Sequence, residues 1–117
     1  MSLKAKDSEN PHKIVSLDEI RQIFSELPDV EEGLSYGTRA WRVKKKLIAR
    51  IHQKEDALVV KTTFDHRESL MNENPLTYYI TDHYANYPFI LVRIPTVKRS
   101  ELREVLGRAW QKAVGNA

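Results

Sequence analysis

The chain contains no cysteine, and only four of its 117 residues are glycine. Without cysteine, the protein cannot form a disulfide, a thiolate nucleophile or a cysteine-based zinc site. The sequence also lacks an apolar run approaching the ~20 residues that a membrane-spanning helix needs. Its start, MSLKAKDSENPHK, has no apolar stretch that resembles the core of a signal peptide. We therefore expect a cytoplasmic protein that is not embedded in a membrane.

Charge is distributed unevenly, although the net charge of the whole chain is only +3. Residues 39–67 carry nine basic and three acidic side chains, a net charge of +6. Residues 13–38 carry two basic and six acidic side chains, a net charge of −4. A basic segment next to an acidic one can attract phosphate groups, so nucleic acid is a candidate partner.

The first structured segment has the pattern of a helix. Ser16 and Glu19 are spaced as a capping box, which predicts that a helix begins after Ser16. The apolar residues that follow recur at helical spacing, at Leu17, Ile20, Phe24 and Leu27. Pro28 is expected to end this helix, and DVEEGLSYGT is expected to form a polar loop.

From Arg39 to Phe64 the apolar residues alternate with polar ones, which predicts three antiparallel strands. The loop between the first two strands decides which side chains share a face. A three-residue loop, Lys44 to Lys46, is preferred here over a two-residue loop, which would mix the two faces. It would place one set on one face, namely Trp41, Val43, Leu47, Ala49 and Ile51. The other face would carry Arg42, Ile48 and Arg50.

The remaining segments predict two helices and one strand. A second capping box, Asp65 to Glu68, precedes a short helix that ends near Asn72. PFILVRIP has the continuous apolar character of a central strand, and SELREVLGRAWQKAV predicts an amphipathic helix with a basic outer face. The order α-β-β-β-α-β-α indicates an α+β domain over residues 15–117, with an antiparallel sheet and helices mainly on one face. Residues 1–14 are expected to form a flexible arm.

Three segments, EEGLSYGTRAWRVKKKLIARI, TDHYANYPFILVRI and ELREVLGRAW, resemble the MmcQ/YjbR family of small bacterial proteins. The resemblance covers residues 15–114, and its landmarks are Gly33, Ser35, Tyr36, Gly37, Lys46, Ala49, His83, Pro88 and Trp110. It implies a compact α+β fold of the double-wing type that binds DNA. Members often have glycine where this chain has Lys45. Without it, either the hairpin turn is wider or Lys45 adopts a positive φ at a cost of about 1 kcal/mol.

The pentapeptide GLSYG, residues 33–37, matches the G-x-S-x-G pattern of serine hydrolases. That pattern indicates a nucleophile only between a strand and a following helix, whereas here a helix pattern precedes it and a strand pattern follows. The adjacent Asp82 and His83 would point in opposite directions from an extended backbone, so they do not complete a triad with Ser35. We assign no catalytic residue and expect a non-enzymatic module.

The first candidate site is a basic hairpin surface for DNA, made by Arg39, Arg42, Lys44, Lys45, Lys46, Arg50 and Lys61. A β-ribbon with a cationic tip can follow phosphates or enter a groove. In the alternative interpretation, the lysines form an ordinary solvated turn and protect an edge strand from aggregation. The sequence has no recognition-helix pattern, so we do not predict that the protein reads a particular DNA sequence.

The second candidate site is the aromatic segment TYYITDHYANY, which begins at Thr77. Its residues, together with Tyr36 of GLSYG, could line a pocket that suits a small planar or anionic ligand, or a protein partner. The residues assigned to this site are Tyr36, Tyr79, Asp82, His83 and Tyr84. The alternative is ordinary packing of amphipathic rings at a sheet edge. Neither Asp-His pair has the spacing of metal ligands, so no metal or cofactor is assigned. A monomer or weak homodimer is expected.

Overall fold

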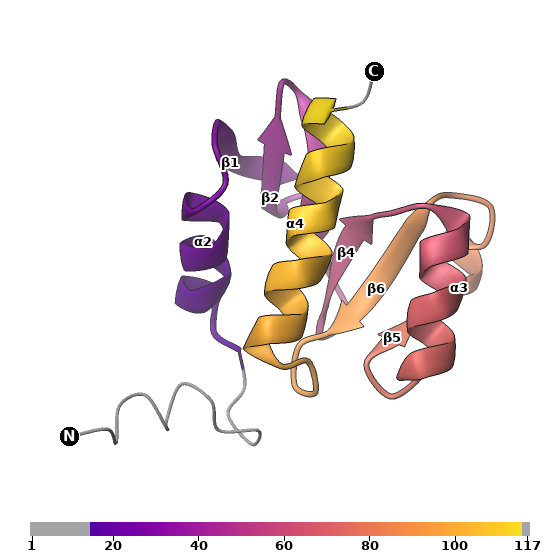
Figure 1. Cartoon of the computed structure of the whole chain (residues 1–117). Helices are drawn as coiled ribbons and strands as arrows, with labels where there is room; N and C mark the ends of the chain where they lie inside the picture. The colour runs from indigo at the N-terminus through magenta and orange to yellow at the C-terminus, as the bar shows by residue number, and fades with distance from the viewer. Residues whose placement is uncertain (1–14, 116–117) are drawn as a thin grey trace.

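The computed structural model describes residues 15–115, which form a six-stranded antiparallel sheet with three α-helices on one face (Figure 1). The expected arm, residues 1–14, lies outside the described residues. The strands are ordered β1-β2-β3-β4-β6-β5 across the sheet. They are β1 (Val30–Ser35), β2 (Thr38–Val43), β3 (Lys46–Ile51), β4 (Ala57–Lys61), β5 (Tyr78–Tyr79) and β6 (Phe89–Arg93). The predicted fold class is confirmed, with two more strands than the pattern of the sequence indicates.

Helix α2 (Leu17–Ser25) begins at the predicted capping box. The Ser16 hydroxyl accepts a hydrogen bond from the Glu19 amide at 3.1 Å, and Glu19 Oε1 accepts one from the Ser16 amide at 2.9 Å. These bonds satisfy amides that a helix start otherwise leaves unpaired. The buried stripe is Ile20, Ile23 and Phe24, whereas Leu17 is 37% exposed and does not join the core.

Strand β1 occupies a segment that the sequence predicts to be a polar loop, so that prediction is wrong. It is one of the two edge strands of the sheet and buries no side chain completely, which is why it lacks apolar alternation. Glu32 accepts hydrogen bonds from Arg21 of α2 at 2.9 Å and from the Trp41 ring nitrogen at 3.2 Å. The hydrogen bond from Arg21 lowers the pKa of Glu32, so the carboxylate stays ionised where it joins β1 to α2.

The β2–β3 hairpin has a two-residue turn, so the three-residue loop expected from the sequence is wrong. Val43 pairs with Lys46, and the two residues between them, Lys44 and Lys45, have φ values of 52° and 68°. Positive φ at both central residues is the pattern of a type I′ turn, which matches the twist of the flanking strands. Of the two outcomes expected without the family's glycine, a wider turn or a positive φ at Lys45, the structure has the positive φ.

A β-bulge restores the separation of faces that a two-residue turn would otherwise disturb. The register shifts between Trp41 and Arg42, and Ile48 is left without a partner on β2. A bulge places two successive residues on one side of the sheet, so Ile48 and Ala49 both enter the core under the helices. Leu47 and Arg50 then face the other side. The predicted faces are thus reversed for Leu47 and Ile48 but correct for Arg50.

The centre of the sheet is β4 and β6, which are buried on both faces. Leu58 and Val60 of β4 join the core under the helices, whereas Ala57 and Val59 join a smaller cluster on the opposite face. Strand β6 pairs with both β4 and β5, which confirms that the apolar run PFILVRIP forms a central strand. Burial on both faces explains why this run shows no alternation.

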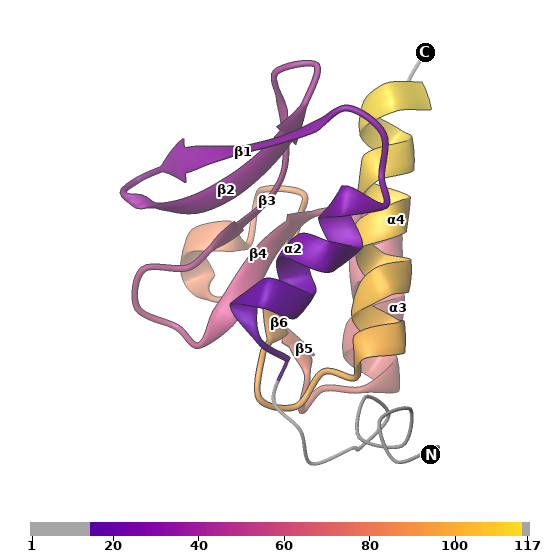
Figure 2. The ribbon, with the colours of Figure 1, turned by 90° about the vertical axis from the view of Figure 1, so that its left-hand side faces the viewer.

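Helix α3 (Phe64–Glu73) begins two residues before the predicted capping box. The N-cap is Thr63, whose hydroxyl accepts a hydrogen bond from the His66 amide at 3.1 Å. Helix α4 (Arg99–Gly115) buries its predicted apolar stripe of Leu102, Val105, Leu106 and Ala109. Figure 2 shows α2 and α4 on the same side of the sheet. None of the described helices has the length and apolar character needed to cross a membrane.

Candidate functional site

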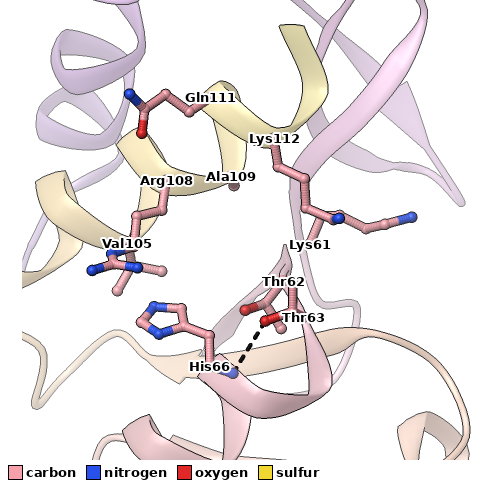
Figure 3. A pocket seen from close by; sticks show the side chains of 9 residues that line it. All are labelled: Lys61, Thr62, Thr63, His66, Val105, Arg108, Ala109, Gln111 and Lys112. Carbon is pink, nitrogen blue, oxygen red and sulfur yellow. Dashed lines mark hydrogen bonds between the residues drawn. The ribbon is translucent and has the colours of Figure 1, made fainter. Parts of the chain in front are cut away.

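A groove opens between the C-terminal half of α4 and the N-terminus of α3 (Figure 3). Its cavity of about 360 Å³ adjoins a second cavity of about 590 Å³, and the two share Lys61, Thr62, Thr63 and Lys112. Four basic side chains line this pair of cavities: Lys46, Lys61, Arg108 and Lys112. We call this site the cationic groove. Within the described part of the chain, no carboxylate lines either cavity.

The fold brings these four cations together from three elements. Arg108 and Lys112 lie one turn apart on α4 and therefore share a helix face. Lys61 is the last residue of β4 and Lys46 the first of β3. Lys46 Nζ donates a hydrogen bond to the Ala113 carbonyl at 3.4 Å, near the C-terminal end of α4, where the helix dipole favours a cation. The two-residue turn before Lys46 adds two exposed lysines, Lys44 and Lys45, next to it in the chain.

The N-terminus of α3 adds polar groups to the groove. The hydroxyl-bearing side chains of Thr62 and Thr63 lie beside the first turn of the helix, where the helix dipole is positive (Figure 3). The His66 ring also lines the groove, and its Nε2 has no hydrogen-bond partner among residues 15–115. Burial and then Arg108 lower the pKa of His66, while Glu104 and Glu73 oppose that shift. His66 is thus a neutral group with a free ring nitrogen at neutral pH.

The space between α3 and α4 changes its charge toward the other end of the helices. There, a cavity of about 440 Å³ is lined by three carboxylates, Glu73, Glu101 and Glu104, together with His66 and Arg108. An anion is therefore attracted at the N-terminus of α3 and repelled at its C-terminus. The positively charged end is the one that Lys46 of the β2–β3 hairpin also lines.

The seven basic residues predicted as one DNA surface lie in different places. Lys46 and Lys61 line the cationic groove, and Lys44 and Lys45 form the turn that precedes Lys46. Arg39 instead lies 3.6 Å from Glu32, beside α2. The guanidinium of Arg42 donates to the Leu34 carbonyl at 3.4 Å. Arg50 is buried on the other face of the sheet, so the structure does not bring the three arginines to the groove.

The predicted aromatic pocket forms in part, on the face of the sheet opposite the α-helices. Tyr36, His83 and Tyr84 line a cavity of about 570 Å³ together with Arg50. Asp82 and Tyr79 do not line it. Tyr79 donates its hydroxyl to Glu55 Oε1 at 2.7 Å, and burial together with this hydrogen bond raises the pKa of Tyr79 to about 12. Tyr79 therefore has a structural role at the edge of the sheet.

Comparison with known proteins assigns the family and supports the fold. The family model for YjbR matches residues 25–112, which is most of the chain. The chain belongs to the YjbR family. The YjbR chain is also similar to a crystal structure of the Deinococcus radiodurans protein DR2400, which has a DUF419 domain. The TM-score is 0.72 at 22% identity, over 93% of this chain and 86% of the other. No curated protein matches the sequence.

In this YjbR chain, the GLSYG motif forms a hairpin. Ser35 ends β1 and pairs with Thr38 of β2 across a turn made by Tyr36 and Gly37, whose φ values are 53° and 77°. The motif is thus strand–turn–strand, whereas the elbow that presents a hydrolase serine is strand–turn–helix. Gly37 supplies a positive φ for the turn, and the Thr38 hydroxyl donates to the Ser35 carbonyl at 2.9 Å.

Sequence reasoning missed Arg108, Lys112 and His66 as site residues in this YjbR chain. The available signal was the basic outer face of the last helix, on which Arg108 and Lys112 are spaced i, i+4. It also missed Arg67, which is 8% exposed and donates to the backbone carbonyls of a distant segment, those of Tyr84, Ala85, Tyr87 and Phe89. These carbonyls are distant from Arg67 in the chain, so the local sequence gives no sign that Arg67 is buried rather than on the helix surface.

Proposed function

We propose that this protein binds nucleic acid, with DNA as the expected form, through contacts between the cationic groove and the phosphate backbone. The observation that carries the proposal is the convergence of Lys46, Lys61, Arg108 and Lys112 on adjoining cavities without a lining carboxylate in the described residues. Cations that are not neutralised by the protein itself are available for phosphates. The positive N-terminus of α3 adds to the same attraction.

The β2–β3 hairpin turn extends this surface. Lys44 and Lys45 are exposed at the tip, and Lys46 anchors the hairpin to the end of α4. A duplex that lies across the groove would also contact the turn. Its phosphates would then be bound at two separate points. Phosphate contacts position a protein on the duplex without reading its sequence. We therefore expect binding with little dependence on sequence.

The test is the salt dependence of binding to a short labelled DNA duplex, measured by fluorescence anisotropy. If the four groove cations neutralise four phosphates, the slope of log K against log salt is about −3.6 for B-form DNA. The double variant Lys61→Ala, Lys112→Ala should reduce the slope by about 1.8 because it removes two of these contacts.

The matched control is Lys54→Ala, Lys98→Ala, which removes the same charge from exposed positions that do not line the groove. This control should keep the slope of the parent protein. Equal loss in both double variants would show that only net charge matters. Unchanged binding in the groove variant, or no measurable binding by the parent protein, would likewise reject the proposal.

A further inference from the structure

Arg50 is a buried cation without an anionic partner among the described residues. Only 6% of this residue is exposed. Its guanidinium donates to the Tyr84 hydroxyl, to Gln53 Oε1 at 3.2 Å and to the Ile51 carbonyl at 3.4 Å, all of which are neutral. Among residues 15–115, no carboxylate forms an ion pair with it. Since buried charges in proteins are normally paired, Arg50 is a candidate partner for an anion from outside the chain.

The cavity beside Arg50 is large enough to supply that anion as part of a small molecule. Its volume of about 570 Å³ falls within the ~300–1,000 Å³ of typical ligand sites. Leu47 and Val59 provide an apolar floor from the sheet. A guanidinium has five N–H donors, and the three hydrogen bonds within the described chain leave two for a ligand. Two donors match the two oxygens of one carboxylate.

Aromatic side chains surround the remainder of the cavity. Tyr36 has a φ of 53°, which is costly for a bulky residue, and its ring lies 5.1 Å from the Arg50 guanidinium carbon. Tyr36 is also 76% exposed, so its ring is accessible at the mouth of the cavity. The His83 ring is nearly perpendicular to the Tyr84 ring, with their centroids 4.8 Å apart, and its centroid lies 6.3 Å from that of Tyr87. These rings offer faces and edges to a planar group.

Arg67 holds the aromatic wall in place before any ligand arrives. From α3, its guanidinium donates to the carbonyls of Tyr84 at 3.0 Å, Tyr87 at 2.8 Å and Phe89 at 3.2 Å. A fourth bond reaches the Ala85 carbonyl at 3.1 Å. The segment that carries Tyr84 and Tyr87 is therefore fixed at its backbone. A wall that is ordered in advance reduces the entropic cost of binding.

We propose that this cavity binds a small planar aromatic carboxylate, whose carboxylate group pairs with Arg50 and whose ring lies among Tyr36, His83 and Tyr87. The one arginine that lines the cavity, Arg50, matches a single negative charge. A phosphate monoester carries about −1.5 to −2 charges and would remain only partly neutralised by one guanidinium. The site lies on the face opposite the helices, and among its lining residues it shares Leu47, but no basic residue, with the cationic groove.

The test is titration of the full chain with benzoate and indole-3-acetate, followed by NMR of the His83 and tyrosine ring signals. Both carboxylates should shift these signals in a saturable way. Benzamide has nearly the same shape without the charge and should bind at least roughly tenfold more weakly, because the charge-assisted bonds are lost. Adenosine monophosphate tests the phosphate alternative and should also bind more weakly than the carboxylates.

Variants locate the binding and separate it from the cationic groove. Arg50→Gln should weaken carboxylate binding at least roughly tenfold. Because Arg50 is buried, the exposed substitutions Tyr36→Ser and His83→Gln provide a second set, and each should weaken binding without unfolding the protein. Tyr79→Phe changes an aromatic residue outside the cavity and should bind like the parent chain, as should Lys61→Ala, Lys112→Ala.

Four results would overturn the proposal. The first is that neither carboxylate shifts the ring signals in a saturable way, and the second is that benzamide binds as tightly as benzoate. The third is that adenosine monophosphate binds more tightly than the carboxylates. The fourth is that the groove variant loses carboxylate binding whereas Tyr36→Ser and His83→Gln retain it. Failure of DNA binding would leave this proposal intact, and the reverse also holds, since the two experiments use different ligands and different residues.

Discussion

The cationic groove and the Arg50 cavity show two ways in which one small domain can present positive charge. In the groove, Lys46, Arg108 and Lys112 are exposed and Lys61 is half-buried, so solvent and salt screen them. In the cavity, a single guanidinium is buried under aromatic rings, where the local dielectric is lower and screening is weak. The first arrangement suits a long polyanion that replaces many counterions. The second suits one small anion chosen by shape.

The largest effect we expect comes from removing the buried arginine that supports the cavity wall. Arg67→Met should lower the free energy of unfolding by about 3–5 kcal/mol, because it removes four charge-assisted hydrogen bonds to backbone carbonyls, one buried and three partly buried. Urea denaturation measures the change.

Arg108→Met is the matched control for this prediction, since Arg108 is an exposed arginine of the groove. Its substitution should alter stability by no more than about 0.5 kcal/mol. A similar loss in both variants would mean that burial does not distinguish the two arginines, which contradicts the comparison above.

Salt should separate the two sites next most strongly. Between about 50 and about 200 mM salt, DNA affinity of the parent chain should fall roughly 150-fold if four phosphates are neutralised. Over the same range, benzoate binding at Arg50 should change less than about threefold, because one buried pair is poorly screened. Parallel titrations of both ligands make the measurement. Equal salt slopes would remove the distinction between exposed and buried charge.

The sequence predicted the elements in which local pattern and burial agree. The capping box of α2, the apolar runs of β4 and β6 and the stripe of α4 each carry their own signal. Strand β1 carried none, because an edge strand that uses Glu32 to bind Arg21 and Trp41 needs no apolar alternation. The bulge at Ile48 was also invisible, since nothing local in KLIARI marks one extra residue.

The site residues were harder to predict because they meet only in the folded chain. A run of basic residues from Arg39 to Lys61 suggested one surface, but strand alternation and the bulge send Arg50 to the face opposite the helices. Lys61 and Arg108 come together because α4 crosses the sheet near the start of α3. Charge along the sequence therefore indicated a basic region without dividing it into two sites.

The hairpin turn offers a smaller effect, of about 1 kcal/mol. Lys45→Gly should stabilise the protein by about that amount, because φ at this position is 68° and glycine has no Cβ to oppose it. Lys45→Ala is the control: it removes the same charge but keeps the Cβ, so it should not stabilise. Thermal or urea unfolding compares the two. DNA binding should weaken equally in both, and a binding difference between them would implicate turn geometry as well as charge.

The smallest expected effect concerns protonation of His66, which links the groove to pH. Burial and Arg108 place the pKa of His66 below that of an unfolded histidine, about 6.5, against the opposing carboxylates Glu104 and Glu73. The folded chain thus binds protons less readily, so its stability is full above pH ~6.5 and declines as the pH falls toward the folded pKa. His66→Gln should remove that decline, measured by urea unfolding at several pH values.

A phosphate bound in the groove stabilises the charged ring, so DNA should raise the pKa of His66 in an NMR titration. Benzoate at Arg50 should leave it unchanged, and a rise with benzoate but not with DNA would place the anion sites the other way round.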